Sequence, residues 1–456
     1  MLVFFIRGDN NMNIKVPEQV REIISKLKSA GYEAYAVGGC VRDSFMGTIP
    51  HDWDICTSAL PEETLNILSA KNIIQNGLKH GTVTVSLDHN LYEITTFRKD
   101  GTYADCRHPD NVTFVNSLHE DLARRDFTIN AMAYDPEKGV FDYFGGISDI
   151  ENKVIRCVGD PDKRFSEDAL RILRALRFVS KLGFTIEKNT AESAVRNAFL
   201  LKKISVERIS EELIQILNGD YVEMVLTDYI DILSIVIPEI VPMVGHLQYN
   251  PHHIYDIWQH TIKVVVNSPK GKVFRLAALF HDIAKPQCFT LDEKGIGHFH
   301  GHPEKSAEMA REIMNRLKLD NKTINSVVLL IKYHDRRPPA EVKNVRKMIS
   351  KIGKENFLAL LKLKRADAKG QNPATIEQKL SYTEALEKLC YQETKDGTEY
   401  NLKTLAVNGN DIINLGVTEG KCIGAILKYL LDSVIGGVTE NKKEELLLLA
   451  RKYLAE

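Results

Sequence analysis

The chain has 456 residues, of which 44% are hydrophobic and 27% are charged, and its formal net charge is -1 at pH 7. This composition is ordinary for a soluble globular protein, and the length predicts about three domains at roughly 150 residues each. A net charge near zero excludes a global attraction to nucleic acid, so any such affinity has to come from local patches.

The cysteines and the apolar segments bear on the cellular compartment. The seven cysteines are scattered and form no CxxC pair, which argues against a disulfide framework. No apolar run approaches the ~18 residues of a membrane span, and the opening letters, MLVFFIR, are too short for a secretory signal. We therefore expect a cytoplasmic protein that does not enter a membrane.

Helix and strand patterns are mixed in the first third of the chain. Residues 17–30 have the apolar spacing of a helix. Residues 33–39 indicate a strand that runs into a glycine turn, and residues 82–87 and 91–97 are further strands rich in β-branched and aromatic side chains. We predict that residues 12–150 form a small α/β head.

Helical patterns dominate from about residue 160 to the end of the chain. The segment 166–182, SEDALRILRALRFVSKL, is strongly amphipathic. We predict a neck and body over residues 151–245, a middle domain over 246–345 and a tail over 346–456. A basic stretch, residues 341–370, crosses the boundary between the middle domain and the tail.

A glycine pair and a carboxylate pair follow the first predicted strand. Gly38 and Gly39 would let the backbone approach a phosphate and offer it N–H groups, and Arg42 could add a bidentate contact. Asp52 and Asp54 are two residues apart, so a strand would point both carboxylates to one side. The two carboxylates repel each other unless they bind a divalent cation such as Mg²⁺, which can also bind triphosphate oxygens as ligands. We predict a metal site rather than two solvated acids.

Three further segments complete an ordered set of motifs. They are DLARRDFTINA at 121–131, GDPDKRF at 159–165, and EDALR at 167–171 with Arg174 and Arg177 after it. With GGCVRD and DWD, they resemble the motif set of the class II CCA-adding tRNA nucleotidyltransferases and related bacterial poly(A) polymerases over residues 34–185. The resemblance implies an α+β fold, in which a polymerase-β-like nucleotidyltransferase head precedes an elongated all-α neck, body and tail.

The resemblance implies template-independent addition of CCA to tRNA 3′ ends from CTP and ATP, with Mg²⁺ as cofactor. Two metal ions at Asp52 and Asp54 would activate the ribose 3′-hydroxyl and stabilise the departing pyrophosphate. A third carboxylate is expected on a neighbouring strand, where Glu93 is the best candidate and a solvent-facing residue is the alternative. Arg125 is expected to bind the nucleotide, and Asp126 suits a ribose hydroxyl.

Asp168 and Arg171 predict how the base is selected. At i and i+3 of a helix their side chains would be neighbours, and would present a hydrogen-bond acceptor beside a donor. Cytosine and adenine both offer an amino donor beside a ring-nitrogen acceptor, so one pair could read both bases and reject uracil and guanine. Arg174 and Arg177 are expected nearer phosphates or structural partners. The alternative is an ion pair on a solvated helix.

Histidines and aspartates gather in the predicted middle domain. The segment LAALFHDIAKP resembles the signature of HD-type metal phosphohydrolases, and His260, His281, Asp282 and Asp335 could meet their H…HD…D pattern. The resemblance implies an HD domain with a transition metal, which would activate water for attack on a phosphoester such as a damaged RNA 3′ end. The alternative is a set of core histidines.

Other segments bear on the substrate. Residues 96–109 resemble the flexible loop of full CCA enzymes, and 341–370 carry nine Lys or Arg against three acids. This basic stretch is either a solvated helix face or, with the segment from residue 407 onward, a tRNA-binding surface. Residues 416–422 match a P-loop only superficially. The alternative functions are an A-adding enzyme or poly(A) polymerase, and an HD-type phosphohydrolase of RNA ends; the oligomeric state stays open.

Overall fold

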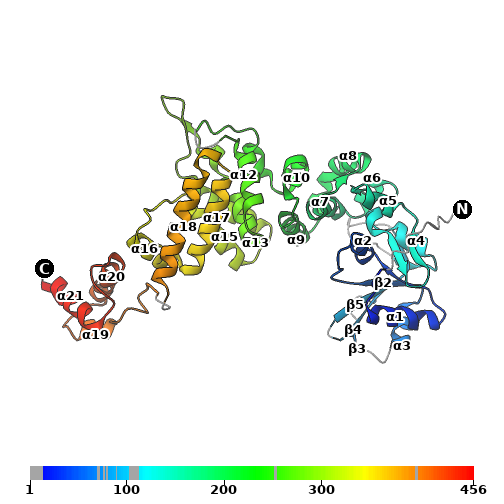
Figure 1. Cartoon of the computed structure of the whole chain (residues 1–456), viewed down its shortest axis with the longest axis horizontal. Helices are drawn as coiled ribbons and strands as arrows, with labels where there is room; N and C mark the ends of the chain where they lie inside the picture. The colour runs from blue at the N-terminus through cyan, green and yellow to red at the C-terminus, as the bar shows by residue number, and fades with distance from the viewer. Residues whose placement is uncertain are drawn as a thin grey trace. The chain divides into compact units, whose positions relative to one another are not determined.

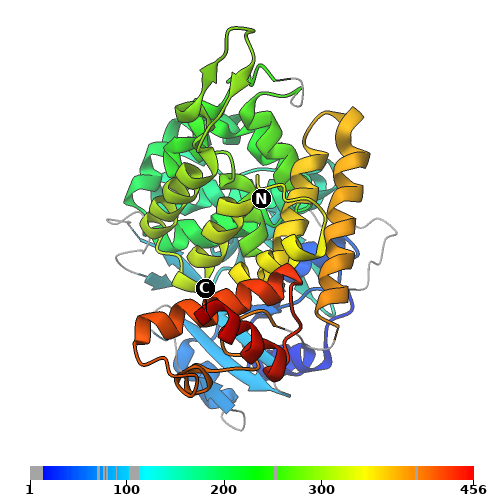
Figure 2. The same cartoon turned by 90° about the vertical axis from the view of Figure 1, so that its left-hand side faces the viewer.

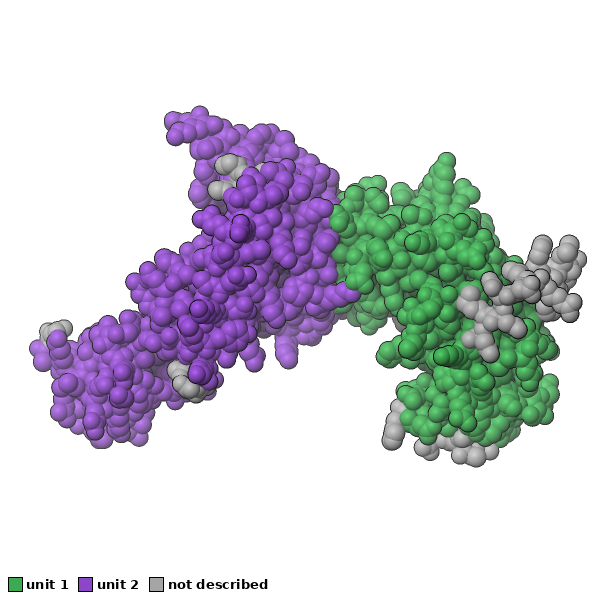
Figure 3. Space-filling model, viewed as in Figure 1, with its two compact units in different colours: residues 1–238 green, residues 239–456 purple. Residues whose placement is uncertain are grey.

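The computed structural model describes residues 14–68, 72–74, 78, 81–88, 90–101, 112–250, 254–395 and 399–455. The chain divides into two compact units, residues 1–238 and 239–456, coloured separately in Figure 3. The four predicted domains are a finer division than these units and stay a prediction. None of the described helices is both long and apolar enough to cross a membrane.

A seven-stranded mixed sheet forms the centre of unit 1, in the order β3-β4-β5-β2-β1-β8-β9. Its β2 and β5 run parallel, and its other neighbouring pairs are antiparallel. The strands are β1 Ala34–Val37, β2 Asp54–Thr57, β3 Asn72–Ile74, β4 Thr82–Leu87, β5 Asn90–Thr96, β8 Met132–Asp135 and β9 Gly139–Asp142. A separate ribbon pairs β6 Arg98–Asp100 with β7 Val112–Phe114. The strands predicted from sequence are therefore confirmed.

Strand β1 is buried on both sides, because successive side chains point to opposite faces of the sheet. Ala34 and Ala36 join one apolar cluster, and Tyr35 and Val37 join the other. Helix α1 covers the first face, as the 17–30 pattern predicts. The helices of the head are α1 Glu18–Ser29, α2 Gly39–Phe45, α3 Pro61–Ile67, α4 Leu118–Ala123 and α5 Gly146–Glu151 (Figure 1).

The rest of unit 1 is helical, with one short parallel pair, β10 Val154–Ile155 and β11 Thr185–Ile186. The helices are α6 Pro161–Glu167, α7 Leu170–Leu182, α8 Lys188–Asn197, α9 Val206–Leu217, α10 Val222–Asp228 and α11 Ile230–Val236. The continuous helix expected over 166–182 is wrong at its start. Asp168 has an extended backbone, with φ -138° and ψ 101°, and its side chain accepts the N–H of Leu170 at 3.0 Å. The chain therefore breaks between α6 and α7.

Unit 2 is built from helices. They are α12 Ile257–Asn267, α13 Lys272–Phe280, α14 His302–Arg316, α15 Asn321–Tyr333, α16 Val342–Ile352, α17 Lys354–Lys369, α18 Ile376–Glu393, α19 Gly409–Ile413, α20 Gly420–Gly436 and α21 Lys443–Ala455. The hairpin of β12 Thr290–Leu291 and β13 Gly297–His298 extends beyond them at the top of Figure 2. Residues 416–422, which match a P-loop only superficially, run into α20.

The basic stretch 341–370 forms α16 and α17, and only part of it faces solvent. Lys364 is buried, while Arg346 and Arg365 pair with Glu393 and Glu387 on α18, each at 2.6 Å. The exposed cations are Lys343, Lys347, Lys351, Lys362 and Lys369. The loop expected over residues 96–109 lies outside the described residues from 102 onward.

Candidate active site

Three carboxylates lie near the start of β2, in the middle of the head sheet. Asp54 is the first residue of β2, and the parallel register makes Glu93 on β5 its Cα partner. Asp52 precedes the strand, and the intervening Trp53 is buried while both aspartates are exposed. Asp52 and Asp54 therefore lie on the side opposite Trp53, as their spacing predicts, and Glu93 occupies the position expected of a third carboxylate. The catalytic roles of all three stay a prediction.

The charged groups around Asp54 favour the binding of an additional cation. Its pKa is raised, first by the loss of solvent around the carboxylate and then by Glu93 and Asp52, whereas Arg125 lowers it. Crowded carboxylates disfavour the ionised form unless positive charge is added. A divalent cation supplies that charge and prefers oxygen ligands, so these residues fit a metal ion chemically.

The glycine turn brings a cation next to these carboxylates. Gly38 ends β1 with φ +83°, and a Cβ at this position would come within 3.1 Å of Nη1 of Arg125. Glycine therefore tolerates both the left-handed backbone and the close guanidinium. Nη2 of Arg125 donates to Asp121 at 3.2 Å. Arg125 therefore lies beside the glycine turn, and its charge acts on Asp54.

Arg42 has partners within the protein, which does not support the predicted phosphate contact. Its side chain is buried, so its donors need acceptors. Nη1 donates to Oδ1 of Asn130 at 2.5 Å, and Nε and Nη2 donate to Oδ1 of Asp43 at 2.8 and 2.6 Å. Arg42 instead ties α2 to the turn that contains Asn130.

Both carboxylate oxygens of Asp126 also accept hydrogen bonds from within the protein. Nε and Nη2 of Arg174 donate to its Oδ2 at 2.9 and 2.6 Å, while its Oδ1 accepts from Asn130 and from the N–H of Phe127. Burial alone would raise the pKa of Asp126, but Arg174 and Asn130 hold it well below its usual range. The expected ribose contact is therefore not supported, and Arg174 has the structural partner that the sequence allowed.

The sequence predicts one helix for Asp168 and Arg171, but Asp168 lies outside α7. Oδ2 of Asp168 is 3.2 Å from Nη2 of Arg208. Nη1 of Arg171 donates to Oε2 of Glu167 at 2.8 Å and to the carbonyl oxygen of Arg164 at 2.9 Å. Asp168 lies outside α7, although the N–H of Arg171 still donates to its carbonyl oxygen at 3.0 Å. Each of the two side chains has a partner within the protein, and their base-reading role stays a prediction.

Sequence reasoning missed the acid on α9 that faces the arginines of α7. Glu212 is buried, and its Oε2 is 3.3 Å from Nε of Arg177. Its pKa is raised by burial, although Arg177 and Arg174 oppose that shift. A signal was available, because Glu212 occupies the apolar face of α9 together with Ile209, Leu213 and Ile216.

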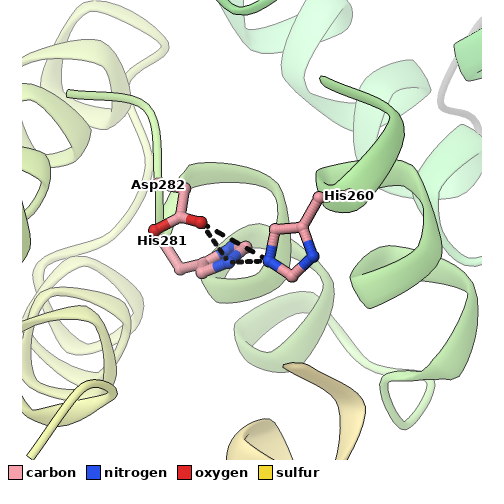
Figure 4. A group of neighbouring side chains, drawn as sticks. All are labelled: His260, His281 and Asp282. Carbon is pink, nitrogen blue, oxygen red and sulfur yellow. Dashed lines mark hydrogen bonds and ion pairs between the residues drawn. The ribbon is translucent and has the colours of Figure 1, made fainter. Parts of the chain in front are cut away.

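A second site lies wholly inside unit 2, at a group of residues that we call the histidine–aspartate cluster. Its members are His260, His281, Asp282, His302, His334 and Asp367. Oδ2 of Asp282 is 3.1 Å from Nε2 of His281 and 3.4 Å from Nε2 of His260 (Figure 4). Burial alone would raise the pKa of Asp282, but His281 and Lys285 hold it well below its usual range.

The structure corrects the fourth member of the predicted H…HD…D set. Asp335 is exposed and lies 3.6 Å from Nη2 of Arg337. Asp367 on α17 takes its place, with Oδ1 at 3.2 Å from Nε2 of His260. His334 follows α15 with its Nε2 3.5 Å from Oδ1 of Asp282, whereas Asp335 lines the same cavity as His334 and faces Arg337.

Comparisons with known proteins agree with this architecture. Family models match the chain at residues 34–156 (Poly A polymerase head domain), 183–242 (probable RNA and SrmB-binding site of polymerase A) and 298–450 (putative tRNA nucleotidyltransferase domain 2). The head match, together with the carboxylates of β2 and β5, defines the class: the chain is a nucleotidyltransferase with a polymerase-type head.

Relatives that match almost the whole chain identify its family within the nucleotidyltransferases. The CCA-adding enzyme of Levilactobacillus brevis is 35% identical over 94% of this chain and 96% of its own length, and that of Leuconostoc mesenteroides is 36% identical over 95% of each. The crystal structure of the Bacillus stearothermophilus CCA-adding enzyme in complex with CTP matches 97% of this chain and 98% of its own, with a TM-score of 0.72 and 30% identity. The chain belongs to the CCA-adding enzymes.

Proposed function

We propose that the head site adds C, C and A to tRNA 3′ ends from CTP and ATP without a nucleic-acid template. The observation that carries the proposal is the parallel register that sets Asp54 beside Glu93. The solved relative that was crystallised with CTP supports the nucleotide class. Asp52, Asp54 and Glu93 would hold divalent ions, with Mg²⁺ as our choice, which supply charge for 3′-hydroxyl activation and pyrophosphate departure.

The remaining site residues take supporting roles in this proposal. Gly38, Gly39 and Arg125 would bind the triphosphate, because the turn offers N–H groups beside a guanidinium. Asp168 and Arg171 would read the base, and a bound base would then compete with Arg208 and Glu167 for their hydrogen bonds. Four further residues would keep these binding residues in position: Arg42, Asp126, Arg174 and Arg177.

The body and tail would hold the tRNA. We assign the head to residues 12–150, the neck and body to 151–245, the middle domain to 246–345 and the tail to 346–456. The exposed lysines of α16 and α17 suit contacts to phosphates, which position RNA without reading its sequence. A cytoplasmic location is proposed as well, in keeping with the described cysteines, which are all free.

Stepwise addition tests this function. We expect the protein with Mg²⁺ to add two C and one A to tRNA lacking CCA, one C and one A to tRNA ending in C, and one A to tRNA ending in CC. UTP and GTP should be used at least about 100-fold less well, because a mismatched edge leaves buried polar groups unpaired. Labelled nucleotides on a sequencing gel measure each product.

The same gel separates the competing functions. Incorporation of A alone, and only at the CC end, would identify an A-adding enzyme. Continued addition of A beyond one residue would identify a poly(A) polymerase. Either pattern contradicts full CCA addition.

We propose a second activity, metal-dependent hydrolysis of phosphoesters, at the histidine–aspartate cluster. It is supported by the convergence of Nε2 atoms and a carboxylate within 4.8 Å of one another, which is a spacing suited to a metal ion. Such an ion would lower the pKa of bound water for attack on phosphorus. The activity would act on phosphorylated RNA ends.

Loss of one imidazole tests this second activity. We expect His281→Ala to lower metal-dependent phosphate release from a 3′-phosphorylated oligoribonucleotide by about 100-fold or more, since removing a ligand typically costs much of the metal affinity. Malachite-green detection of phosphate measures the rate. The control is His119→Ala in unit 1, where the ring contacts Tyr143 and Phe144 instead. Equal rates for His281→Ala and the parent would exclude the cluster as the site.

A further inference from the structure

We propose that five aromatic side chains beside the histidine–aspartate cluster stack on the unpaired bases of an RNA 3′ end. We call these side chains the aromatic rim, and they are Tyr249, Phe289, His298, Phe299 and His300. The step rests on the phosphohydrolase activity proposed above. It names the substrate of that activity as a single-stranded RNA end rather than a small phosphate ester.

The cavity next to the cluster has room for only the end of such a substrate. Its volume is about 280 Å³, and its walls include Asp282, Lys285, His334 and Arg337. Lys285 Nζ lies 2.7 Å from Oδ2 of Asp282, whereas Arg337 is exposed and suits a phosphate oxygen. Cavities that enclose a whole small ligand are usually larger, about 300–1,000 Å³. This cavity therefore suits a terminal phosphate with part of its sugar, and it leaves the bases outside.

The rings of the aromatic rim run from the wall of this cavity to the protein surface. Phe299 lines the cavity. Its ring centroid is 5.5 Å from that of Phe289, which lies 5.9 Å from that of Tyr249. His298 and His300 also line the cavity, and their rings are 5.4 Å apart and nearly parallel, at 7°. Tyr249 and His300 are both exposed, so each end of the rim presents a ring on which an unpaired base can stack.

Tyr249 is held in a backbone conformation that a bulky residue rarely adopts, with φ +48°. The hairpin of β12 and β13, visible in Figure 2, fixes this conformation. The N–H of Gly297 in β13 donates to the carbonyl oxygen of Tyr249 at 2.8 Å, and a Cβ at Gly297 would lie 2.1 Å from the carbonyl oxygen of Gln248. Burial does not account for the tyrosine, because its side chain is 55% exposed. Backbone strain at an exposed ring indicates a role in binding.

Exposed rings beside a cation favour single-stranded nucleic acid as the ligand. Every base has a face that can stack on an aromatic side chain, whereas a sugar phosphate without a base has none. Neighbouring base pairs cover those faces in a duplex, so an unpaired end fits better. In the hydrolysis, the oxygen of water bonds to phosphorus, the P–O bond to the ribose breaks, and the ribose oxygen leaves with a proton from that water. The product is a free 3′-hydroxyl, which is the group that the head would extend.

A ratio of two rates tests the proposal. Release of phosphate from a short oligoribonucleotide with a 3′-phosphate is compared with release from ribose 5-phosphate, which has no base, for the full chain with Mn²⁺. We expect Tyr249→Asn to lower the ratio of the two kcat/KM values by about 10-fold, because it removes a stacking ring. Asparagine is chosen because it tolerates the left-handed backbone. Tyr249→Phe, which keeps the ring, should restore the ratio.

The matched control is Tyr391→Ala. The side chain of Tyr391 is 54% exposed, like that of Tyr249, but it lies on α18 with Nζ of Lys354 5.7 Å from its ring centroid. This variant should leave the ratio at the value of the parent. An unchanged ratio for Tyr249→Asn, whether both rates hold or both fall, would overturn the aromatic rim and leave the phosphohydrolase activity in place.

A parent protein that releases no phosphate from either substrate would instead reject the phosphohydrolase activity. Photocrosslinking then decides the aromatic rim separately. An oligoribonucleotide with a photoreactive thiouridine near its 3′ end is irradiated with the full chain, and the crosslinked peptides are mapped by mass spectrometry. Crosslinks to Tyr249 or His300 support the rim as an RNA-binding surface, and their absence would overturn it together with the activity.

Discussion

Asp54→Ala is expected to lower the rate of CTP and ATP addition by roughly 1000-fold, on the order of 4 kcal/mol of transition-state stabilisation. Asp54 is the carboxylate that connects the other two, since Glu93 is its register partner on β5 and Asp52 lies two residues before it. Its loss removes a ligand from each proposed ion. Single-turnover addition of labelled CTP to tRNA lacking CCA measures the effect.

Two controls make this result specific. Glu22→Ala removes an acid on α1 that pairs with the neighbouring Lys26, and its rate should match the parent. Binding of tRNA to the Asp54→Ala protein, followed by fluorescence anisotropy, should stay within about 3-fold, because phosphate contacts elsewhere dominate RNA affinity. Full addition by Asp54→Ala would reject the metal assignment.

Part of the head could be predicted because its signals are local. Strands β4 and β5 are short runs rich in β-branched residues, and the alternation of Asp52, Trp53 and Asp54 predicts which side chains share a face. Strands β3, β8 and β9 were not predicted. The neighbouring position of Glu93 needed one further assumption, a parallel pairing of β2 and β5 although β3 and β4 lie between them along the chain. Periodicity alone does not provide that pairing. The motif order provided it.

The base-reading pair shows where periodicity misleads. Residues 166–182 have continuous helical spacing, yet the chain leaves the helix at Asp168. An aspartate two residues before an apolar helical run is a common helix-capping position, and its hydrogen bond to the N–H of Leu170 shows it acting as one. Reading residues 166–182 as one continuous helix therefore placed Asp168 inside a helix that begins only at Leu170.

The histidine–aspartate cluster is a tertiary feature, so sequence could find only part of it. His281 and Asp282 are adjacent and recognisable, but Asp367 lies more than 80 residues later in the sequence. Its signal was its position in α17, where it shares a helix face with Leu360, Lys364 and other buried residues. An acid on a buried face needs a partner, and this observation would have favoured Asp367 over the exposed Asp335.

The ion pair between Arg174 and Asp126 joins α7 to the RRDF segment, and we expect Arg174→Met to destabilise unit 1 by about 2 kcal/mol at pH 7. Removing one partner of a buried ion pair destabilises the fold more when the remaining charged group is not solvated. Here the side chain of Arg174 is 34% exposed and that of Asp126 is 8% exposed, so solvent reduces the penalty. Urea unfolding followed by the fluorescence of Trp53, in a Trp258→Phe background, measures unit 1.

The pH dependence of this effect identifies Asp126 as its source. The folded-state pKa of Asp126 lies below its unfolded value near 4, so the pair stabilises fully above that unfolded value and loses its contribution as pH falls through the folded pKa. The difference between Arg174→Met and the parent should therefore shrink as pH is lowered from 7 to 3. Arg196→Met, which removes an exposed pair with Asp162, should leave the free energy of unfolding close to that of the parent. A penalty for Arg174→Met that is the same at pH 7 and pH 3 would show that lost packing, rather than the charge of Asp126, causes it.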